Sequence, residues 1–315
     1  AVTENGTLSS TGTIAFNDVD LIDSHTVSVA SAEGNLGGLT ASVSEKAGAA
    51  NGSVSWSYSV DDAAVQYLAA GETKTETFTV TLDDGNGGTV DQTVSVVITG
   101  TNDAAVLGSA TISLTEADTA LSTSGTLTIS DIDHGEAHFV AQNGTAGQYG
   151  SFSVDADGAW SYQAGAHNEL AANQVVSDSF TVAAADGTTT SVTVTLTGTN
   201  DAAVLSSATA ALTETNAALS ASGQLTISDV DSAATFVAQS GTAGQYGSFS
   251  VDANGAWSYQ AGAHNELAAN QVVSDSFTVA AADGTTTSVT VTLTGTNDAA
   301  VLSSATAALT ETNAA

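Results

Sequence analysis

The chain repeats itself at the scale of a whole domain. Residues 139–218 recur as residues 236–315, a spacing of 97, and only the pairs Asn143/Ser240 and Asp157/Asn254 differ. Residues 1–100 form a more distant copy, which keeps the landmarks WSY and FTV in the same order. A unit of about 100 residues is the size of an independent domain. The sequence therefore predicts tandem domains rather than the short units of a solenoid.

These landmarks set the expected domain boundaries. We expect repeat 1 at residues 1–100, repeat 2 at 101–198 and repeat 3 at 199–295. Residues 296–315 then form a linker and the first strand of a following repeat, and repeat 1 lacks the start of that strand.

Within each repeat the apolar residues alternate with polar ones. Val192, Val194 and Leu196 alternate with Thr193 and Thr195, which is typical of a half-buried strand. About seven such strands at short, regular spacing predict an all-β fold of tandem immunoglobulin-like, antiparallel β-sandwiches. Trp160 and Tyr162 lie on one face of a strand and are expected in the core.

The composition excludes several classes of partner. The chain has 34 Asp and Glu against 2 Lys and Arg, a net charge of −32, and no Cys. A nucleic-acid partner needs a basic face, and an acidic membrane surface would repel this chain. No apolar run approaches the roughly 20 residues that span a bilayer. We also expect no enzyme, because the sequence lacks a catalytic constellation or a phosphate-binding loop.

The strand order places the acidic residues at the two poles of each domain. In repeat 2 the first strand is expected to run to the far pole, where it ends at Glu116. The strand Gly125–Ser130 returns to the near pole and leads into Asp131 and Asp133. The strand Phe180–Ala185 also returns to the near pole and leads into Asp186. Stacked domains would bring these poles together. Joint 1 would gather Glu4, Asn102, Asp103, Asp131, Asp133 and Asp186. Joint 2 would gather Glu116, Asn200, Asp201, Asp229, Asp231 and Asp283.

Carboxylates gathered in this way repel one another unless a cation lies between them. Ca²⁺ prefers six to eight oxygen ligands and suits a mixture of carboxylate, amide and backbone oxygens better than Mg²⁺ or Zn²⁺. The sequence therefore predicts Ca²⁺ at both joints. The alternative for any single acidic residue is a solvated loop position. Asp155 and Asp157 are interpreted as hairpin-turn residues, because repeat 3 has Asn254 in place of Asp157.

The stretch TGTNDAAVL occurs at residues 99–107, 197–205 and 294–302. Together with the Thr-Glu, S-D-x-D, WSY, FTV and Asp-Gly elements, it resembles the VCBS-type, cadherin-like immunoglobulin-like repeats of giant bacterial RTX adhesins. The resemblance covers essentially the whole chain. It implies a secreted or cell-surface extender module that interdomain Ca²⁺ makes rigid and that serves attachment and biofilm formation. One departure is that the Pro of the family motif is Ala105, Ala203 and Ala300 here, so we expect rigidity to depend more on the metal.

Two further functions stay open at this point. The outward Thr193, Thr195 and Thr197 are a candidate surface for ice or glycan binding, although any soluble strand exposes such residues. The second is a filament in which identical subunits join head to tail, the segment 296–315 supplying the strand that repeat 1 lacks. Asn297 and Asp298 would then meet Asp18, Asp20 and Asp84, the head cluster, and form another Ca²⁺ joint.

Overall fold

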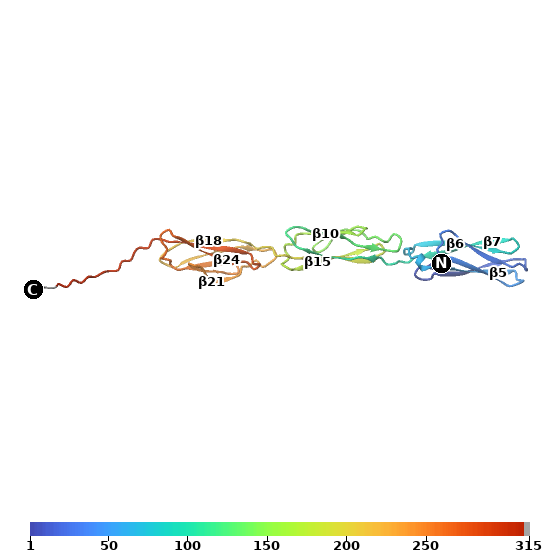
Figure 1. Ribbon diagram of the computed structural model, residues 1–315, viewed down its shortest axis with the longest axis horizontal. Helices are drawn as coiled ribbons and strands as arrows, with labels where there is room; N and C mark the ends of the chain where they lie inside the picture. Colours follow the sequence, from blue (N-terminus) through green and yellow to red (C-terminus); the bar gives the residue numbers. More distant parts are fainter. Residues whose placement is uncertain (312–315) are drawn as a thin grey trace. The chain divides into compact units, whose positions relative to one another are not determined.

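The computed structural model describes residues 1–311 and consists almost entirely of β-strands (Figure 1). The chain divides into two compact units. Unit 1 contains Ala1–Leu114, Thr119–Gly165 and Val176–Leu196, and unit 2 contains Thr115–Asp118, Ala166–Val175 and the chain from Thr197 onward. The residues of joint 1 all lie in unit 1 and those of joint 2 in unit 2, so each joint is described within its own unit.

Helix is confined, in the described residues, to one 3-10 turn, η1 (Asp62–Ala64). Asp61 caps it, because its side chain accepts a hydrogen bond from the Ala63 amide at 3.3 Å. Within residues 1–311 no helix combines the length and the apolar character that a membrane span requires.

Repeat 1 is a sandwich of two sheets, in the orders β1-β7-β6-β3 and β2-β5-β4. Its strands are β1 (Val2–Thr3), β2 (Ser9–Asn17), β3 (Thr26–Ser31), β4 (Gly38–Glu45), β5 (Asn51–Ser59), β6 (Thr73–Asp83) and β7 (Thr89–Thr99). The β6–β7 hairpin is paired along its whole length, from Thr73 beside Thr99 to Asp83 beside Thr89. Successive residues of these strands alternate between the core and solvent, as the sequence pattern predicts.

Repeat 2 has the sheet orders β10-β14-β13-β12 and β15-β16-β9, with a short pair, β11-β8, beside the linker. Its strands are β8 (Val106–Leu107), β9 (Ala110–Thr115), β10 (Leu121–Thr126), β11 (Ile129–Ser130), β12 (Gln142–Ala146), β13 (Gly150–Val154), β14 (Ala159–Ala164), β15 (Val175–Ala183) and β16 (Thr189–Thr197).

Repeat 3 follows the same plan, with the orders β19-β23-β22-β21, β18-β25-β24 and β17-β20. Its strands are β17 (Val204–Leu205), β18 (Ala208–Thr213), β19 (Leu219–Gln224), β20 (Ile227–Ser228), β21 (Gln239–Ala243), β22 (Gly247–Val251), β23 (Ala256–Ala261), β24 (Val272–Ala280) and β25 (Thr286–Thr294).

The expected single strand Gly125–Ser130 is wrong. The structure divides it into β10, which pairs with β14, and β11, whose Ile129 and Ser130 lie beside Leu107 and Val106. The division allows the end of the strand to leave its sheet and pair with the incoming linker. Asp131 and Asp133 follow directly after β11 and are thereby held next to that linker.

In repeats 1 and 3 an early strand, β1 or β18, pairs in parallel with the last strand, β7 or β25. In repeat 3, β18 lies beside β25 over six residue pairs, from Ala208/Val289 to Thr213/Thr294. In repeat 1, β1 provides two such pairs, Val2/Ile98 and Thr3/Thr99. Residues 296–311, expected to form the first strand of a following repeat, contain no strand and run as an extended segment (Figure 1). The last four residues of that expected strand, 312–315, lie outside the described part of the chain.

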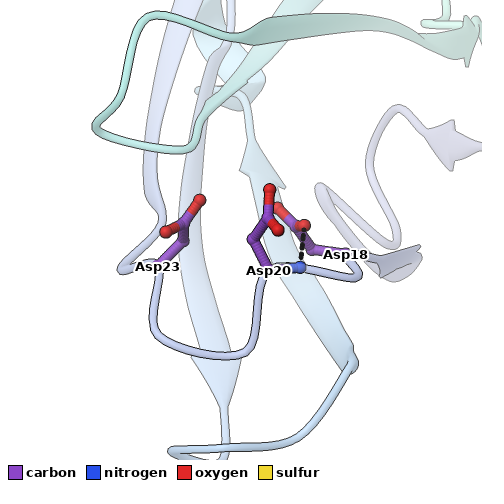
Figure 2. Close-up of side chains that lie close together, drawn as sticks. All are labelled: Asp18, Asp20 and Asp23. Carbon is purple, nitrogen blue, oxygen red and sulfur yellow. Dashed lines mark hydrogen bonds between the residues drawn. The ribbon is translucent and has the colours of Figure 1, made fainter.

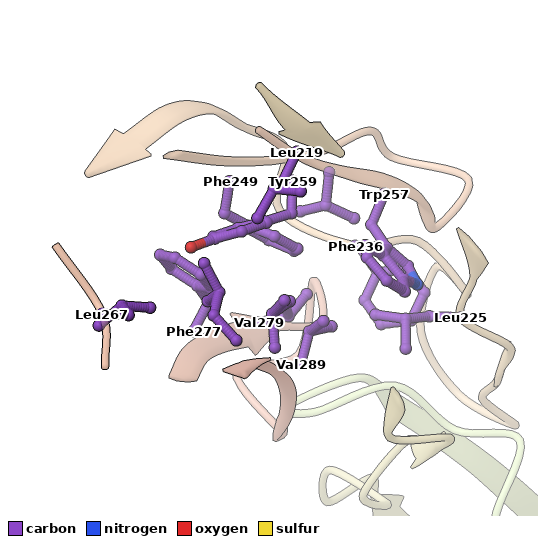
Figure 3. Close-up of a cluster of buried hydrophobic side chains, with 13 residues drawn as sticks. Leu219, Leu225, Phe236, Phe249, Trp257, Tyr259, Leu267, Phe277, Val279 and Val289 are labelled. Carbon is purple, nitrogen blue, oxygen red and sulfur yellow. The ribbon is translucent and has the colours of Figure 1, made fainter. Parts of the chain in front are cut away.

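Each sandwich has its own aromatic core. In repeat 3, Tyr259 and Phe249 are fully buried and contact Phe277 of the opposite sheet. Trp257, which is 5% exposed, lies at the other end of the same cluster, near Phe236 and Leu225 (Figure 3). Trp160 and Tyr162 of repeat 2 are 4% and 0% exposed, so their predicted place in the core is confirmed. Burial of one such side chain contributes about 2 kcal/mol.

A buried carboxylate ties a loop to each core. In repeat 3, Asp275 accepts hydrogen bonds from the amides of Gln245, Tyr246 and Gly247 at 2.7, 3.0 and 2.9 Å and from the Tyr259 hydroxyl at 2.9 Å. Asp178 and Glu76 make the corresponding contacts with Tyr162 and Tyr58. Burial raises the pKa of the Tyr259 hydroxyl far above its usual range, and the hydrogen bond to Asp275 acts in the same direction.

The Asp275→Ala change should therefore destabilise repeat 3 by about 3 kcal/mol, because it leaves three part-buried amides and the buried Tyr259 hydroxyl without a partner. Tyr259→Phe, which removes one hydrogen bond, should cost about 1 kcal/mol. Urea unfolding followed by Trp257 fluorescence measures both, in a background where Trp56 and Trp160 are replaced by Phe. Equal losses in the two variants would contradict the anchoring role of Asp275.

Candidate metal centres

The same arrangement of a buried glutamate occurs at the end of every sandwich. Glu4, Glu116 and Glu214 are 1%, 3% and 1% exposed. The Oε2 atom of each accepts a backbone hydrogen bond from the threonine that precedes the Asn-Asp pair: Thr101 at 2.9 Å, Thr199 at 3.0 Å and Thr296 at 2.8 Å. The Oε1 atom of each is buried and has no hydrogen-bond partner. In each glutamate, a backbone hydrogen bond thus fixes Oε2, and Oε1 is left without a partner.

The aspartates after β11 and β20 are held in the same way. Asp133 Oδ2 accepts from the Asp103 amide at 2.8 Å, and Asp231 Oδ2 accepts from the Asp201 amide at 3.3 Å. The second oxygen of each, Oδ1, is buried and unpaired. The Asp-x-Asp spacing also forms a tight loop, because Asp131 Oδ1 accepts from the Asp133 amide at 2.9 Å.

The aspartates of the last hairpin hold the linker from the other side. Asp186 Oδ2 accepts from the Ala105 amide and Asp283 Oδ2 from the Ala203 amide, each at 3.0 Å. A hydrogen bond from the Thr285 hydroxyl is the main cause that lowers the pKa of Asp283 to about 2. Burial of Asp186 acts to raise its pKa, but hydrogen bonds from Thr188 and Ala105 outweigh it, and the pKa is lowered. Both carboxyls therefore stay ionised at neutral pH.

The amide side chains of the linker orient these carboxylates. Asn200 Nδ2 lies 3.4 Å from Asp283 Oδ2, and the side chain of Asn102 donates a hydrogen bond to Asp186. The aspartates next to them, Asp103 and Asp201, each have a buried, unpaired Oδ2. The structure thus brings together the predicted residues of joint 1 around the 101–105 linker and those of joint 2 around the 199–203 linker.

Four residues of these sites were not predicted. Glu136 Oε2 at joint 1 and Asn168 Oδ1 at joint 2 are further buried oxygens without a partner. Asp62 accepts from the Asn5 amide at 2.9 Å near Glu4. Oxygens of Asp118, Glu116 and Asp201 lie within 4.8 Å of one another. Spacing in the sequence could have indicated two of them. Glu136 follows Asp131 by five residues, the same spacing as between Asp18 and Asp23. Asp118 follows Glu116 by two residues.

The crowding of carboxyls at the joints changes their acidity. Burial, followed by a hydrogen bond with Asp118 and repulsion from Glu116, raises the pKa of Asp201 to about 6. Burial is also the main cause that raises the pKa of Glu4, Glu136 and Asp231. In residues 1–311 the ion pairs of carboxylates are all with histidines, none of them at joint 2. At neutral pH these joints hold more negative charge than the protein itself balances.

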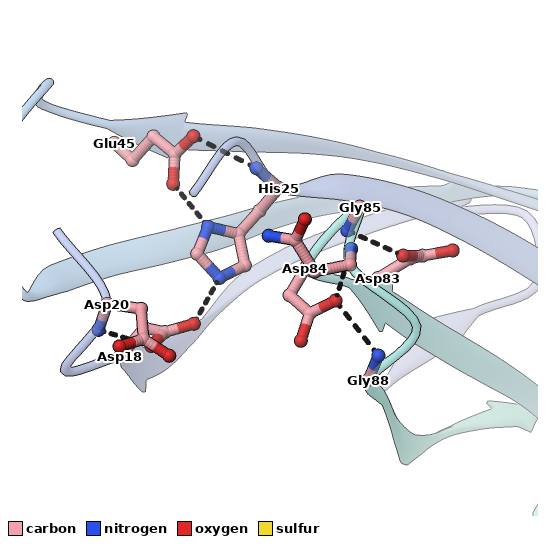
Figure 4. Close-up of polar contacts among 9 residues, drawn as sticks. Asp18, Asp20, His25, Glu45, Asp83, Asp84, Gly85 and Gly88 are labelled. Atoms are coloured by element: carbon pink, nitrogen blue, oxygen red, sulfur yellow. Dashed lines mark hydrogen bonds and ion pairs between the residues drawn. The ribbon is translucent and has the colours of Figure 1, made fainter. Parts of the chain in front are cut away.

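The head cluster differs from the two joints. Asp18, Asp20 and Asp23 offer oxygens within 4.8 Å of one another, and Asp18 Oδ1 accepts from the Asp20 amide at 2.9 Å (Figure 2). Asp84 faces this loop from the β6–β7 turn, where its Oδ1 accepts from the Gly88 amide at 2.9 Å (Figure 4). Sequence reasoning missed Asp23 and also His25, whose ring nitrogens lie 3.0 Å from Asp18 Oδ2 and 2.7 Å from Glu45 Oε2.

The last two predicted ligands lie beyond repeat 3. Asn297 and Asp298 are exposed, and Asn297 Nδ2 lies 3.5 Å from the Asp298 carbonyl oxygen. They follow Thr296, which is fixed to Glu214 as in the two joints. The structure therefore places half of a joint at this end of the chain. Its pairing with the head cluster of another subunit stays a prediction.

Comparison with known proteins gives one family. The sequence profile of the bacterial cadherin-like domain matches residues 102–199 and 200–296. A search of curated protein sequences gave no match.

The solved structures that match this chain include three cadherin ectodomains. Domains EC1–4 of protocadherin gamma B3 share 12% identity over 95% of this chain and 73% of that chain, with a TM-score of 0.43. The extracellular domain of protocadherin gamma B4 shares 12% identity over 93% and 47%, with a TM-score of 0.41, so this chain spans about half its length. Mouse cadherin-23 EC22–24 shares 14% identity over 89% of each chain, with a TM-score of 0.38.

The raised pKa of Asp201 predicts how joint 2 responds to pH without metal. Between about pH 4 and pH 6 the folded state keeps a proton on Asp201 that the unfolded state has lost, so stability falls as pH rises through this window. The lowered pKa of Asp283 has the opposite effect, because it makes stability rise with pH. This effect is confined to pH values below about 4. In chelator, the melting temperature should therefore be higher at about pH 5 than at about pH 7.

Asp201→Asn is the matched control for this pH effect. It keeps the shape of the side chain and removes the charge, so the difference between the two melting temperatures should shrink. Thermal unfolding of both proteins in chelator provides the measurement. The same pH dependence in the variant and the parent chain would contradict the assignment to Asp201.

Proposed function

The chain belongs to the family of bacterial cadherin-like domains, and on that basis we propose that it is a non-catalytic extender of a bacterial surface adhesin, stiffened by Ca²⁺ at its interdomain joints. Membership of the family indicates an extracellular structural or adhesion role. No enzyme family matches. Beyond this family role, we propose that the protein binds Ca²⁺, that the joints hold the ion, and that the protein functions in attachment and biofilm formation.

One observation carries the metal proposal. Buried oxygens without hydrogen-bond partners gather at the joints: Glu4 Oε1, Asp103 Oδ2, Asp131 Oδ2, Asp133 Oδ1 and Glu136 Oε2 at joint 1, and Glu116 Oε1, Asn168 Oδ1, Asp201 Oδ2 and Asp231 Oδ1 at joint 2. A buried carboxylate oxygen without a partner costs several kcal/mol. Because such atoms are concentrated at the predicted sites, a cation is the partner that fits them.

The donor atoms favour Ca²⁺ over other metals. The unpaired atoms at both joints are carboxylate or amide oxygens, with no Cys in the chain, which is the ligand type that hard cations prefer. Mg²⁺ requires near-ideal octahedral geometry, whereas Ca²⁺ accepts six to eight ligands from flexible loops. Bound Ca²⁺ would supply the positive charge that the joints lack.

The chain's own residues explain how a cation would stiffen a joint. At joint 1 the ligands come from three places: Glu4 beside β1, Asp103 in the linker, and the loop Asp131–Asp133 after β11. Backbone hydrogen bonds already orient each group toward the linker. A cation that contacts all three would hold repeat 1 and repeat 2 at a fixed angle. Without it, repulsion among the carboxylates would favour separation and a flexible linker.

Ca²⁺ should therefore stabilise and extend the protein. With about 5 mM Ca²⁺ and a dissociation constant of about 10⁻⁴ to 10⁻³ M, the gain is about 1 to 2 kcal/mol for each ion. Thermal unfolding and small-angle scattering, with Ca²⁺ and with chelator, measure the melting temperature and the maximum dimension. If neither quantity changes when Ca²⁺ is removed, the joint proposal is wrong.

Single substitutions separate ligands from turn residues. Asp201→Ala and Asp231→Ala should each weaken Ca²⁺ binding at joint 2 by about tenfold, because a ligand and a negative charge are lost. Asp157→Asn is the matched control, since repeat 3 carries Asn254 at that position and Asp155 fixes the turn through the Asp157 amide at 3.1 Å. Calorimetric titration decides between them, and equal losses in the three variants would overturn the ligand assignment.

A further inference from the structure

Joint 1 contains a direct contact between repeat 1 and repeat 2. The His134 amide, in the loop after β11, donates a hydrogen bond to the Tyr67 carbonyl oxygen of repeat 1 at 3.0 Å. The rings of these two residues also lie against each other, with their centroids 4.6 Å apart, and His134 Nδ1 lies 3.7 Å from Glu72 Oε1. Tyr67 itself packs against the core of repeat 1. The contact therefore connects a loop of repeat 2 to a fixed point on repeat 1.

Joint 2 has different residues at both positions of this contact. The counterpart of His134 is Ser232, because each follows the second aspartate of an Asp-x-Asp pair. The amide and the hydroxyl of Ser232 both donate to Asp229, at 2.9 and 2.6 Å. The counterpart of Tyr67 is Glu169, because each precedes the buried leucine of a Leu-Ala-Ala segment, and Glu169 pairs with a histidine two residues earlier. Both replacement residues thus have partners within their own repeat.

The linker aspartate also has a different neighbour at each joint. At joint 1 the side-chain amide of Asn5 donates to Asp103 Oδ1 at 3.3 Å, and Gln66 donates to Asn5 Oδ1 at 2.9 Å. At joint 2 the neighbour of Asp201 is Asp118, and oxygens of the two carboxyls lie within 4.8 Å of each other. An amide donates a hydrogen bond to a carboxylate, whereas two ionised carboxylates repel and neither has a proton to donate. Joint 1 thus has a neutral donor where joint 2 has another acidic group.

We infer that the two joints are not equivalent: direct contacts between the repeats help to hold joint 1, and joint 2 is a hinge whose order depends on a cation. For joint 2 this rests on the proposed function, whereas the contacts at joint 1 need no ion. Repulsion among carboxylates acts at both joints when Ca²⁺ is absent. At joint 1 the Tyr67–His134 contact and the Asn5 amide oppose this repulsion. Removal of Ca²⁺ therefore loosens joint 2 more than joint 1.

The difference between the joints determines where the chain bends when Ca²⁺ is scarce. Repeats 1 and 2 move together, because the contacts at joint 1 connect residues of both repeats without an ion. Repeat 3 gains freedom relative to them, because the carboxylates of Asp118 and Asp201 then repel each other. A fall in Ca²⁺ thus loosens this segment mainly at one joint rather than equally along its length.

The test measures the order of each joint separately in the full chain. Because the chain has no Cys, spin labels can be attached to cysteines introduced at exposed strand positions. The pair Ser95→Cys and Thr181→Cys spans joint 1, and the pair Thr181→Cys and Thr278→Cys spans joint 2. Pulsed electron paramagnetic resonance then gives the distribution of distances between the labels. In chelator the distribution across joint 2 should be about twofold wider than with about 5 mM Ca²⁺, and the distribution across joint 1 should widen less.

Reciprocal substitutions provide the matched controls. Asn5→Asp keeps the shape of the side chain and gives joint 1 the pair of carboxylates found at joint 2. His134→Ser gives joint 1 the residue of repeat 3 and removes the ring contact with Tyr67. In chelator, each change should widen the distribution across joint 1 and leave that across joint 2 as it is in the parent chain. Conversely, Asp118→Asn should narrow the distribution across joint 2 in chelator.

Two results would overturn the difference between the joints: equal widening across both joints in chelator, or no effect of Asn5→Asp and His134→Ser on joint 1. If Ca²⁺ still raises the melting temperature in that case, the joint proposal stands and the inequivalence of the joints alone fails. If the parent chain gives the same distances with Ca²⁺ and with chelator, the joint proposal fails, and the hinge at joint 2 fails with it. Widening of joint 1 by the two substitutions would then still support the direct contact.

Discussion

The ends of the sandwiches depend on carboxylates in which one oxygen accepts a backbone hydrogen bond and the other is buried without a partner. Glu4, Glu116 and Glu214 show the device in its simplest form, since each accepts one backbone amide and keeps a buried oxygen free. The backbone hydrogen bond sets the position of the linker, and the second oxygen remains buried without a hydrogen-bond partner. One residue type thus connects the end of a sandwich to the start of the next segment.

The linker itself contributes backbone donors. The amides of Asp103 and Ala105 bind Asp133 and Asp186, so the linker is held on two sides by loops of repeat 2. The resembled motif has proline at the position of Ala105, and proline has no amide hydrogen to donate. We expect rigidity to depend more on the metal where the proline is missing, and the structure adds a hydrogen bond that a proline could not make. In this chain a charge-assisted hydrogen bond to Asp186 restrains the backbone where the family motif has a ring.

The sandwiches and the joints use the same first strand. In repeats 2 and 3 the linker leads directly into a short strand, β8 or β17, that pairs with the end of β11 or β20. The following strand of repeat 3, β18, then closes the sheet edge beside β25. Because these segments are continuous, the strand that completes a core also delivers the Asn-Asp pair to its pole.

The sequence alone determined the all-β class, the tandem repeats and the placement of most acidic residues at the poles. These follow from local properties: the period of two along each strand, the near-identity of residues 139–218 and 236–315, and turns that place Asp131 and Asp133 after a strand. Only the tertiary structure decided which oxygen of each carboxylate is bound and which is free. It also brought in Asp62 and Asn168, which reach the joints from other segments. Such contacts depend on strand register and loop paths across many residues, which a residue pattern does not encode.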